Sequence, residues 1–478
     1  MSEGRVLPKS VDYTKILPLA VESRSRRRSF FPVNGQSFTD NANNIIRIDI
    51  SASAFLDTRH SYLRFRLTNN SGQAFGPDFG GGHGIIRRLR IEQAGTVLSD
   101  VNHYNKLMSA IILPSQSGFD GLAHRSLTEG QRFANNGGNG NSAVPLPAAD
   151  VSGAVASTIS NTNGLVANGA TYTFSIPLMN GLLGTTQSKM VPLQLLSSSP
   201  VTIEIEMAPL LDIGVFAAAA PVAGTSYTID NVRYIAQLVE VGPEVDAQLR
   251  MVQEMSGGKL VLNGTDYTHF NGNIPAGATG NQVINVPARR KSLKSLFFVG
   301  ASTTYAAAGA GGAEHNFVFN LSYGGNFNMT DYQVKIGSVV YPPTPIDAQF
   351  QGGNQAFQRG EVLSELAKCW GTLSSAHGTG ILNTINCYAA DCDVGGMAVA
   401  SPNGAAVTSY QFSPFGLDLE AFQRVAAESG VNTASSSLPI SLIINVGAAN
   451  AEAVNVDCYV SYDSLYFIDE TGAIRVSM

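Results

Sequence analysis

The sequence has little charge. Charged residues make up 14% of its 478 positions, well below the roughly 25% of an average soluble protein. Thirty Lys and Arg residues against 36 Asp and Glu residues give a formal net charge of −6. A chain with this balance does not bind polyanions through its overall field, so any nucleic-acid contact must be local.

Cysteine and aromatic residues are also scarce. The four cysteines, Cys369, Cys387, Cys392 and Cys458, lack the paired short spacings of a zinc site and are too few for a disulfide scaffold. We therefore expect no metal, no cofactor, and thiols that are buried or half-buried. A single Trp and 8% aromatic residues give little support to a carbohydrate-binding surface.

Long hydrophobic runs are absent too. The first residues carry no apolar stretch behind a basic region, which a secretory signal would need. The longest nearly apolar run, residues 214–224, is too short to span a bilayer and contains Pro221. From these features we expect an intracellular product.

What the sequence has instead is a series of short alternating runs bounded by Gly, Asn, Pro and Ser. Residues 46–50, 62–68 and 203–207 alternate polar and apolar side chains, a pattern typical of strands with one buried face. Many such strands with few helices indicate an all-β fold. Helical periodicity is confined to three short segments, at 102–112, 243–255 and 361–370.

The order of these signals repeats once along the chain. The run at 46–50 and the strand at 62–68 have counterparts at 283–286 and 293–299, and later segments follow at a similar spacing. The repeat is roughly 240 residues long, far beyond the ~20–50 residues of solenoids and propellers. Because residue identity across the repeat is negligible, the architecture repeats rather than the sequence. Two consecutive β-sandwiches follow.

These signals divide the chain into three parts. We predict an N-terminal basic arm at 1–40, a first sandwich at 41–242, and a second sandwich at 243–478 that a short linking helix at 243–255 opens. Two long uncharged loops, at 114–170 and 301–330, are expected to rise from one end of the sandwiches.

Catalytic patterns are weak. Asp57, His60 and Ser61 have the residue types of a nucleophile triad, but they lie within five positions of one another, and a triad needs groups that the fold brings together. The Gly-rich run at 80–84 lacks the Gly-Lys-Ser/Thr ending of a phosphate loop. We expect no enzymatic activity.

Several stretches of the sequence resemble the double jelly-roll major capsid proteins of adenoviruses, large eukaryotic DNA viruses, virophages and polinton-like viruses. The stretches lie at 55–67, 191–207, 332–346, 428–433 and 459–467. Those at 332–346 and 428–433 are similar to the second roll of the polinton-like group, which favours the polinton-like or virophage-like branch. None of the stretches is catalytic, so their order and spacing carry the resemblance.

The resemblance implies an all-β fold of two consecutive eight-stranded jelly-roll β-sandwiches, with short helices and long surface loops. It further implies homotrimeric, pseudo-hexagonal capsomers that tile an icosahedral shell enclosing a DNA genome. Neighbouring capsomers, penton proteins and minor capsid proteins would be the partners. The protein would reside in the virion after synthesis in the host cytoplasm, with import into the nucleus as an alternative route.

The N-terminal 28 residues contain seven Lys and Arg residues against three Asp and Glu residues, in a chain that is negative overall. Arg24, Arg26, Arg27 and Arg28 form the densest part of this basic arm. We expect them to contact the inner face of the shell, where genome DNA, an internal membrane or a minor capsid protein offers phosphate or carboxylate groups. A solvated tail or a strand that clamps a neighbouring subunit is the alternative interpretation.

Other functions remain open at this point. A two-domain β-sandwich binding or scaffold protein of viral or transposon origin would show the same pattern, because fold does not fix function. A carbohydrate-binding protein is a further alternative.

Overall fold

The computed structural model describes most of both halves of the chain. The described residues are 23–72, 75–76, 80–113, 128–129, 167–186, 189–196, 199–213, 215–216, 225–302, 321, 327–348, 360–370, 399–400, 406–407, 414–420, 430–435, 438–450 and 453–477. Most of the two long loops at 114–170 and 301–330 lies outside these residues, as do Cys387 and Cys392.

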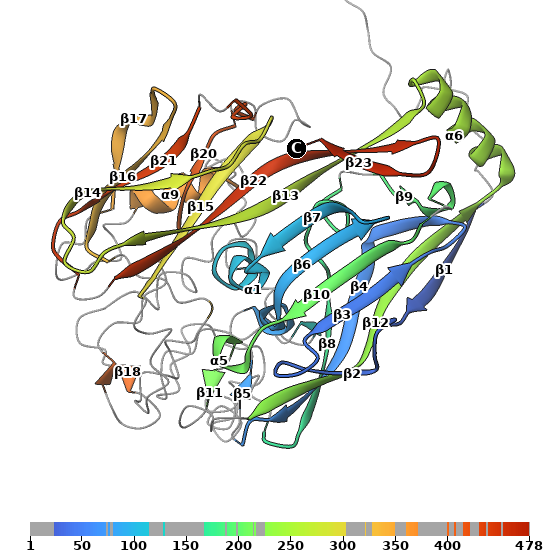
Figure 1. The fold of residues 1–478 in the computed structure, drawn as a ribbon, viewed down its shortest axis with the longest axis horizontal. Coiled ribbons are helices and arrows are strands. Elements are labelled where there is room, and N and C mark those ends of the chain that lie inside the picture. The colour runs from blue at the N-terminus through green and yellow to red at the C-terminus, as the bar shows by residue number, and fades with distance from the viewer. Residues whose placement is uncertain are drawn as a thin grey trace, which may run out of the picture.

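The first half of the chain forms a sandwich of two antiparallel sheets (Figure 1). One sheet has the order β1-β12-β4-β8, with bounds Ser23–Phe30, Ser226–Val241, Phe55–Asn70 and Thr171–Ile176. The short strands β2 (Ser37–Thr39) and β9 (Val191–Pro192) extend it beside β12 and β4. The facing sheet has the order β3-β10-β6-β7, with bounds Ile45–Ile50, Val201–Met207, Ile86–Gln93 and Thr96–Asn102.

The second half repeats this topology. One sheet has the order β13-β22-β15-β20, with bounds Lys259–Ile274, Val454–Asp469, Leu293–Ser302 and Phe415–Asp418, and β23 (Ile474–Ser477) pairs with β22. The facing sheet has the order β14-β21-β16-β17, with bounds Gly280–Val286, Ile440–Val446, Met329–Ile336 and Val339–Asp347. The predicted pair of eight-stranded jelly rolls is thereby confirmed.

The correspondence between the halves shows where the first sandwich begins. In the second sandwich β13 pairs with β22, and in the first sandwich β1 pairs with β12 in the same place. The strand β1 therefore belongs to the first jelly roll, and the sequence-based boundary at residue 41 leaves this strand in the arm. Likewise, β20 in the second sandwich occupies the place of β8 in the first.

Helices are short and few in this structure. The three predicted helical segments are confirmed as α1 (Tyr104–Lys106) continuing into the π-helix η3 (Leu107–Ile112), α6 (Pro243–Met255) and α9 (Gly360–Lys368). Pro243 at the first helical position and two acidic residues in the first turn favour the start of α6. The other short elements in the described residues are β5 (Phe75–Gly76), β11 (Val215–Phe216), β18 (Val399–Ala400), β19 (Ala406–Val407), η2 (Gly81–Ile85), η5 (Leu193–Leu195) and α5 (Leu210–Ile213).

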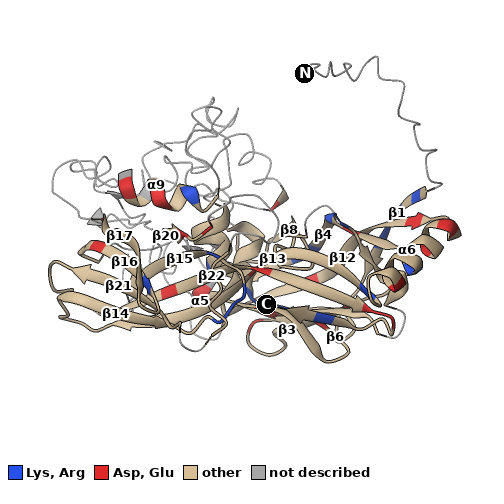
Figure 2. Ribbon diagram, turned by 90° about the horizontal axis from the view of Figure 1, so that it is seen from above, with Lys and Arg blue, Asp and Glu red and all other residues tan. Residues whose placement is uncertain are grey.

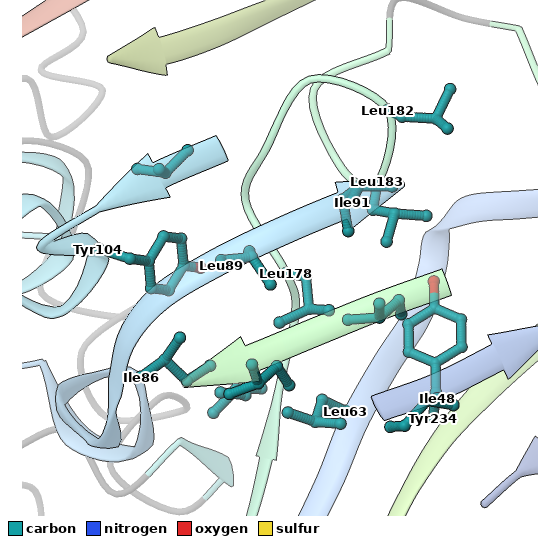
Figure 3. Packing of buried hydrophobic residues seen from close by; sticks show 14 of the residues in the cluster. Ile48, Leu63, Ile86, Leu89, Ile91, Tyr104, Leu178, Leu182, Leu183 and Tyr234 are labelled. Carbon is teal, nitrogen blue, oxygen red and sulfur yellow. The ribbon is translucent and has the colours of Figure 1, made fainter. Parts of the chain in front are cut away.

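The core of each sandwich follows from the alternation of its strands. In β3, Ile46, Ile48 and Ile50 point inward, while the residues between them are at least partly exposed. They meet Leu63 and its neighbours on β4 from the facing sheet, and Figure 3 shows Ile48 near Leu63 and Tyr234. Burying a large apolar side chain stabilises the fold by about 1.5–3 kcal/mol, so this alternation specifies which face of each strand points inward.

The strand β22 is different because it is buried on both faces. Its side chains Cys458, Val460 and Tyr462 point into the core of the second sandwich, whereas Tyr459 and Tyr466 belong to the core cluster of the first. One face of the β13-β22 sheet is therefore covered by the first sandwich. The two jelly rolls form one packed unit within the chain.

Candidate assembly interfaces

The four arginines of the basic arm lie on the edge strand β1. Backbone pairing aligns Arg24 with Glu240, Arg26 with Leu238, Arg27 with Gln237 and Arg28 with Ala236. Because successive side chains of a strand point to opposite faces, Arg24, Arg26 and Arg28 share one face and Arg27 points to the other. The sequence places the four arginines in one cluster, whereas the structure distributes them over the two faces of the strand.

Each arginine of β1 is exposed, and three have partners within the chain. Arg26 forms an ion pair with Glu240 at 2.7 Å. Arg27 donates a hydrogen bond of 2.9 Å to the hydroxyl of Tyr62 and lies over its ring, and Arg28 lies over the ring of Phe30. These contacts are at the surface, where such pairs contribute little to stability. The arginines therefore remain available to other molecules.

The outer face of the β1-β12-β4 sheet is basic. Arg64 and Arg233 are direct cross-strand partners, so two like charges lie side by side on this face. Arg27 joins them from β1 through its contact with Tyr62. The Nε atom of Arg233 is buried and has no hydrogen-bond partner among the described residues. Asp230 neutralises Arg66 nearby, at 2.6 Å, but the face as a whole has an excess of positive charge. We call Arg27, Arg64 and Arg233 on this face the basic row.

The equivalent face of the second sandwich is covered within the chain and contains a buried ionic cluster. Asp457 on β22 accepts hydrogen bonds from His269 at 2.8 Å and Asn271 at 3.2 Å, and it forms an ion pair with Lys106 of the first sandwich. Burial alone would raise the pKa of Asp457, but the charge of Lys106 and the hydrogen bond from His269 outweigh it, so the pKa lies below its usual range. This carboxylate links the two jelly rolls.

A second buried carboxylate lies in the same interface. Asp266 on β13 is fully buried and accepts hydrogen bonds from the hydroxyl of Ser99 at 2.9 Å and from the backbone of Tyr267. Asn180 donates to the same hydroxyl at 3.0 Å. Burial raises the pKa of Asp266, and the hydrogen bond from Ser99 partly offsets that rise. Ser99 and Asn180 come from the first sandwich, so this network also fixes the relative position of the two.

His103 in this interface predicts a pH dependence of stability. Its ring lies 4.7 Å from that of His269, with Asp457, Lys106 and Arg87 also nearby, and burial and the neighbouring His269 lower its pKa to about 4. The unfolded chain takes up this proton near pH 6.5, and the native chain only near pH 4. Between those values the unfolded state binds more protons, so the free energy of unfolding falls as the pH falls.

We expect a loss of about 2 kcal/mol between pH 7 and pH 4.5 from this group. Chemical unfolding of a His103→Gln variant over the same pH range should give a free energy of unfolding that falls by about 2 kcal/mol less than that of the wild type. Parallel profiles for wild type and His103→Gln would contradict the assignment.

The residues considered for catalysis do not form a site. His60 contacts Asp57 at 2.7 Å, but the hydroxyl of Ser61 donates to the backbone carbonyl of Asp57 and accepts from the amide of Gln237. The hydroxyl is therefore engaged with backbone atoms. His83 of the Gly-rich run is buried against Tyr104. Within the described ranges, no group of three or more His, Cys, Asp or Glu residues is arranged to hold a metal ion.

The two described cysteines are free thiols, with Cys458 buried and Cys369 half-buried. Burial raises the pKa of both. Among the helices that the structure describes, none is long and apolar enough to cross a membrane.

Comparisons with known proteins identify the fold. No protein-family model and no curated protein matches the sequence. Among solved structures, VP54 of the virus PBCV-1 matches with a TM-score of 0.56 at 10% identity, over 98% of this chain and 99% of that one. The Faustovirus major capsid protein matches with a TM-score of 0.54 at 9% identity, over 97% and 92%.

The mavirus major capsid protein matches with a TM-score of 0.51 at 13% identity, over 100% of this chain and 96% of that one. These matches extend over nearly the whole length of both chains, so they include both sandwiches and their connection. The sequence-based resemblance is thereby confirmed at the level of the fold. The protein has the double jelly-roll fold of the viral major capsid proteins.

Proposed function

We propose that this protein is the major capsid protein of a DNA virus. Three copies associate into a pseudo-hexagonal capsomer, capsomers tile an icosahedral shell around the genome, and the chain catalyses no reaction. The doubled architecture carries the proposal, since two jelly rolls of identical strand order in one chain give six jelly rolls of the same topology in a trimer.

The contact between the two sandwiches suggests how copies join. Within the chain, the first sandwich covers the outer face of β13 and β22. The equivalent face of the first sandwich, formed by β1, β12 and β4, is the basic row that includes Arg64 and Arg233. In a closed ring of six jelly rolls this face meets the second sandwich of the next copy. Such a contact joins unlike surfaces, and a rotation of one third of a turn closes it into a trimer.

The outer surfaces of the other two sheets differ in charge. In the first sandwich, Arg47 and Glu204 form an ion pair at 2.6 Å and Arg90 lies near both Glu204 and Glu92. In the second sandwich, β14 and β21 carry no charged residue, as Figure 2 shows. The neighbouring strand β16 carries Asp331 and the exposed Lys335, so the uncharged area is confined to β14 and β21. This area loses little solvation free energy when a neighbour covers it. We assign it to contacts with neighbouring capsomers.

Charge reversal on the basic row tests the proposed subunit contact. The double variant Arg64→Glu and Arg233→Glu replaces two positive charges at the centre of that face by negative ones. Reversed charges in an interface cost several kcal/mol, so we expect the trimer to dissociate into folded monomers. Light scattering after size exclusion would measure the mass, and circular dichroism would verify the fold.

The matched control reverses two charges outside the basic row. Arg289 and Lys291 lie on an exposed turn of the second sandwich, and the double variant Arg289→Glu and Lys291→Glu should remain trimeric. A trimer that persists in the Arg64→Glu and Arg233→Glu variant would count against this contact. A wild-type chain that is monomeric would instead favour a two-domain binding or scaffold protein.

The arginines of β1 also contribute to the proposed assembly. Arg24, Arg26 and Arg28 are exposed and share one face of β1, and we assign them to contacts at the inner face of the shell. Phosphate groups of the genome or of an internal membrane, or carboxylates of a minor capsid protein, suit guanidinium groups. We also propose that the protein resides in the virion.

A further inference from the structure

The helix α6 has an apolar side that the described part of the chain leaves mostly uncovered. Of its 13 residues only Gln253 is buried. Val252 is 50% exposed, and Met255 is 83% exposed. A helix of this length is marginal in water unless an apolar face packs against something. Figure 1 shows α6 at one end of the molecule, beside the ends of β12 and β13.

A hollow of about 620 Å³ lies between α6 and the strands beneath it. The helix contributes Val245, Leu249 and Val252 to its walls, and β12 and β13 contribute further valines and leucines. Two lysines, Lys189 and Lys259, stand among these apolar side chains. The hollow is an apolar groove of the size that takes a ligand or a short peptide.

The described chain begins at this groove. Ser23, the first residue of β1, pairs with Val241, which lines the groove. The 22 residues before it include the apolar run 16–21, Ile-Leu-Pro-Leu-Ala-Val, followed by Glu22. Pro18 disfavours a helix in this run and suits an extended chain.

The lengths of the helix α6 and of the segment agree. Six extended residues span about 20 Å, and a helix of 13 residues is also about 20 Å long. Only Glu22 separates the run from β1, so the chain can enter the groove directly at Val241 and follow α6 toward Val252. A segment that starts at the mouth of the groove has a far higher effective concentration there than any separate molecule.

We propose that residues 16–21 of the same chain lie in the groove between α6 and β13 and cover the apolar side of the helix. Glu22, between this run and β1, would add a negative charge beside a groove whose charged lining residues are lysines. Residues 1–15, including Lys9 and Lys15, would then leave the molecule from the far end of α6. This docking occurs within one chain and does not depend on the proposed trimer.

Hydrogen exchange on the full-length protein tests the docking. The double variant Leu17→Asp and Leu19→Asp places two charges in the apolar run, so the segment should leave the groove. We expect the amides of α6 to exchange about tenfold faster or more in this variant, because the helix loses its cover. The matched control, Val6→Asp and Leu7→Asp, changes two apolar residues of the same segment outside the run and should leave α6 exchange unchanged.

A cysteine pair distinguishes the same chain from a neighbouring copy. With Leu19→Cys and Val252→Cys in one full-length protein, mild oxidation should give a disulfide within one chain, identified by peptide mapping on non-reducing samples. Unchanged α6 exchange in the Leu17→Asp and Leu19→Asp variant would overturn the proposal. A disulfide that links two chains, or no disulfide at these positions, would overturn it as well.

Discussion

The Asp457→Ala variant should lose about 3–5 kcal/mol of unfolding free energy. The carboxylate of Asp457 is the partner of both Lys106 and His269, and the side chains of all three are at most 13% exposed. Removing the carboxylate leaves Lys106 buried between the two sandwiches without its counter-charge. Urea unfolding at pH 7, followed by circular dichroism, would measure the loss.

Two further variants define the cause of that loss. Asp230→Ala removes the carboxylate of an exposed ion pair with Arg66, and it should cost no more than about 1 kcal/mol. A double variant, Asp457→Leu with Lys106→Met, replaces the ion pair by apolar side chains and should recover much of the stability. If Asp457→Ala lost no more than Asp230→Ala does, the cluster would not hold the sandwiches together.

The Gly264→Val variant should be destabilised by about 3 kcal/mol, near the upper end for overpacking. A Cβ atom on Gly264 would lie 2.4 Å from the backbone carbonyl oxygen of Gly181, in the first sandwich. A backbone atom cannot rotate away as a side chain does. The two sandwiches would have to move apart, and the hydrogen bond between Ser99 and Asp266 would lengthen.

Gly242 is the matched position for this test, because a Cβ atom there meets nothing within 4 Å. Gly242→Ala should therefore change the thermal midpoint by little. Differential scanning calorimetry of both variants would compare the midpoints. An unchanged midpoint for Gly264→Val would show that the close approach of the two backbones is not needed for the packing of the two sandwiches against each other.

Much of the fold was predictable from the sequence, because apolar alternation specifies strands that have one buried face. Ile46, Ile48 and Ile50 show that pattern, and the structure buries all three. The repeat gave the number of sandwiches for the same reason. The helix 243–255 was predictable from Pro243 and the spacing of Val245, Leu249 and Val252.

The strand β1 was not predictable in this way. Its sequence, Ser-Arg-Ser-Arg-Arg-Arg-Ser-Phe, has no apolar alternation, because the strand lies at a sheet edge with both faces exposed over most of its length. Backbone hydrogen bonds to β12 hold it there, and those bonds carry no side-chain signature. From the sequence alone, the run of arginines in β1 therefore indicates an arm and not a strand of the sandwich.

The interface between the sandwiches was only partly visible in the sequence. Asp457 stands between apolar neighbours in a strand that is buried on both faces, and a carboxylate in such a run is a signal that could have been used. Its partner Lys106 lies 351 positions away, however, and nothing local links the two. The groove beside α6 likewise joins segments that only the tertiary fold brings together.

The solution mass of the purified wild-type chain tests the central claim most directly. Size exclusion with light scattering, followed by negative-stain imaging of the main peak, would give both mass and outline. The account predicts a species with three times the 50.4 kDa chain mass and a hexagonal outline. A stable monomer at concentrations where capsomers form would contradict it.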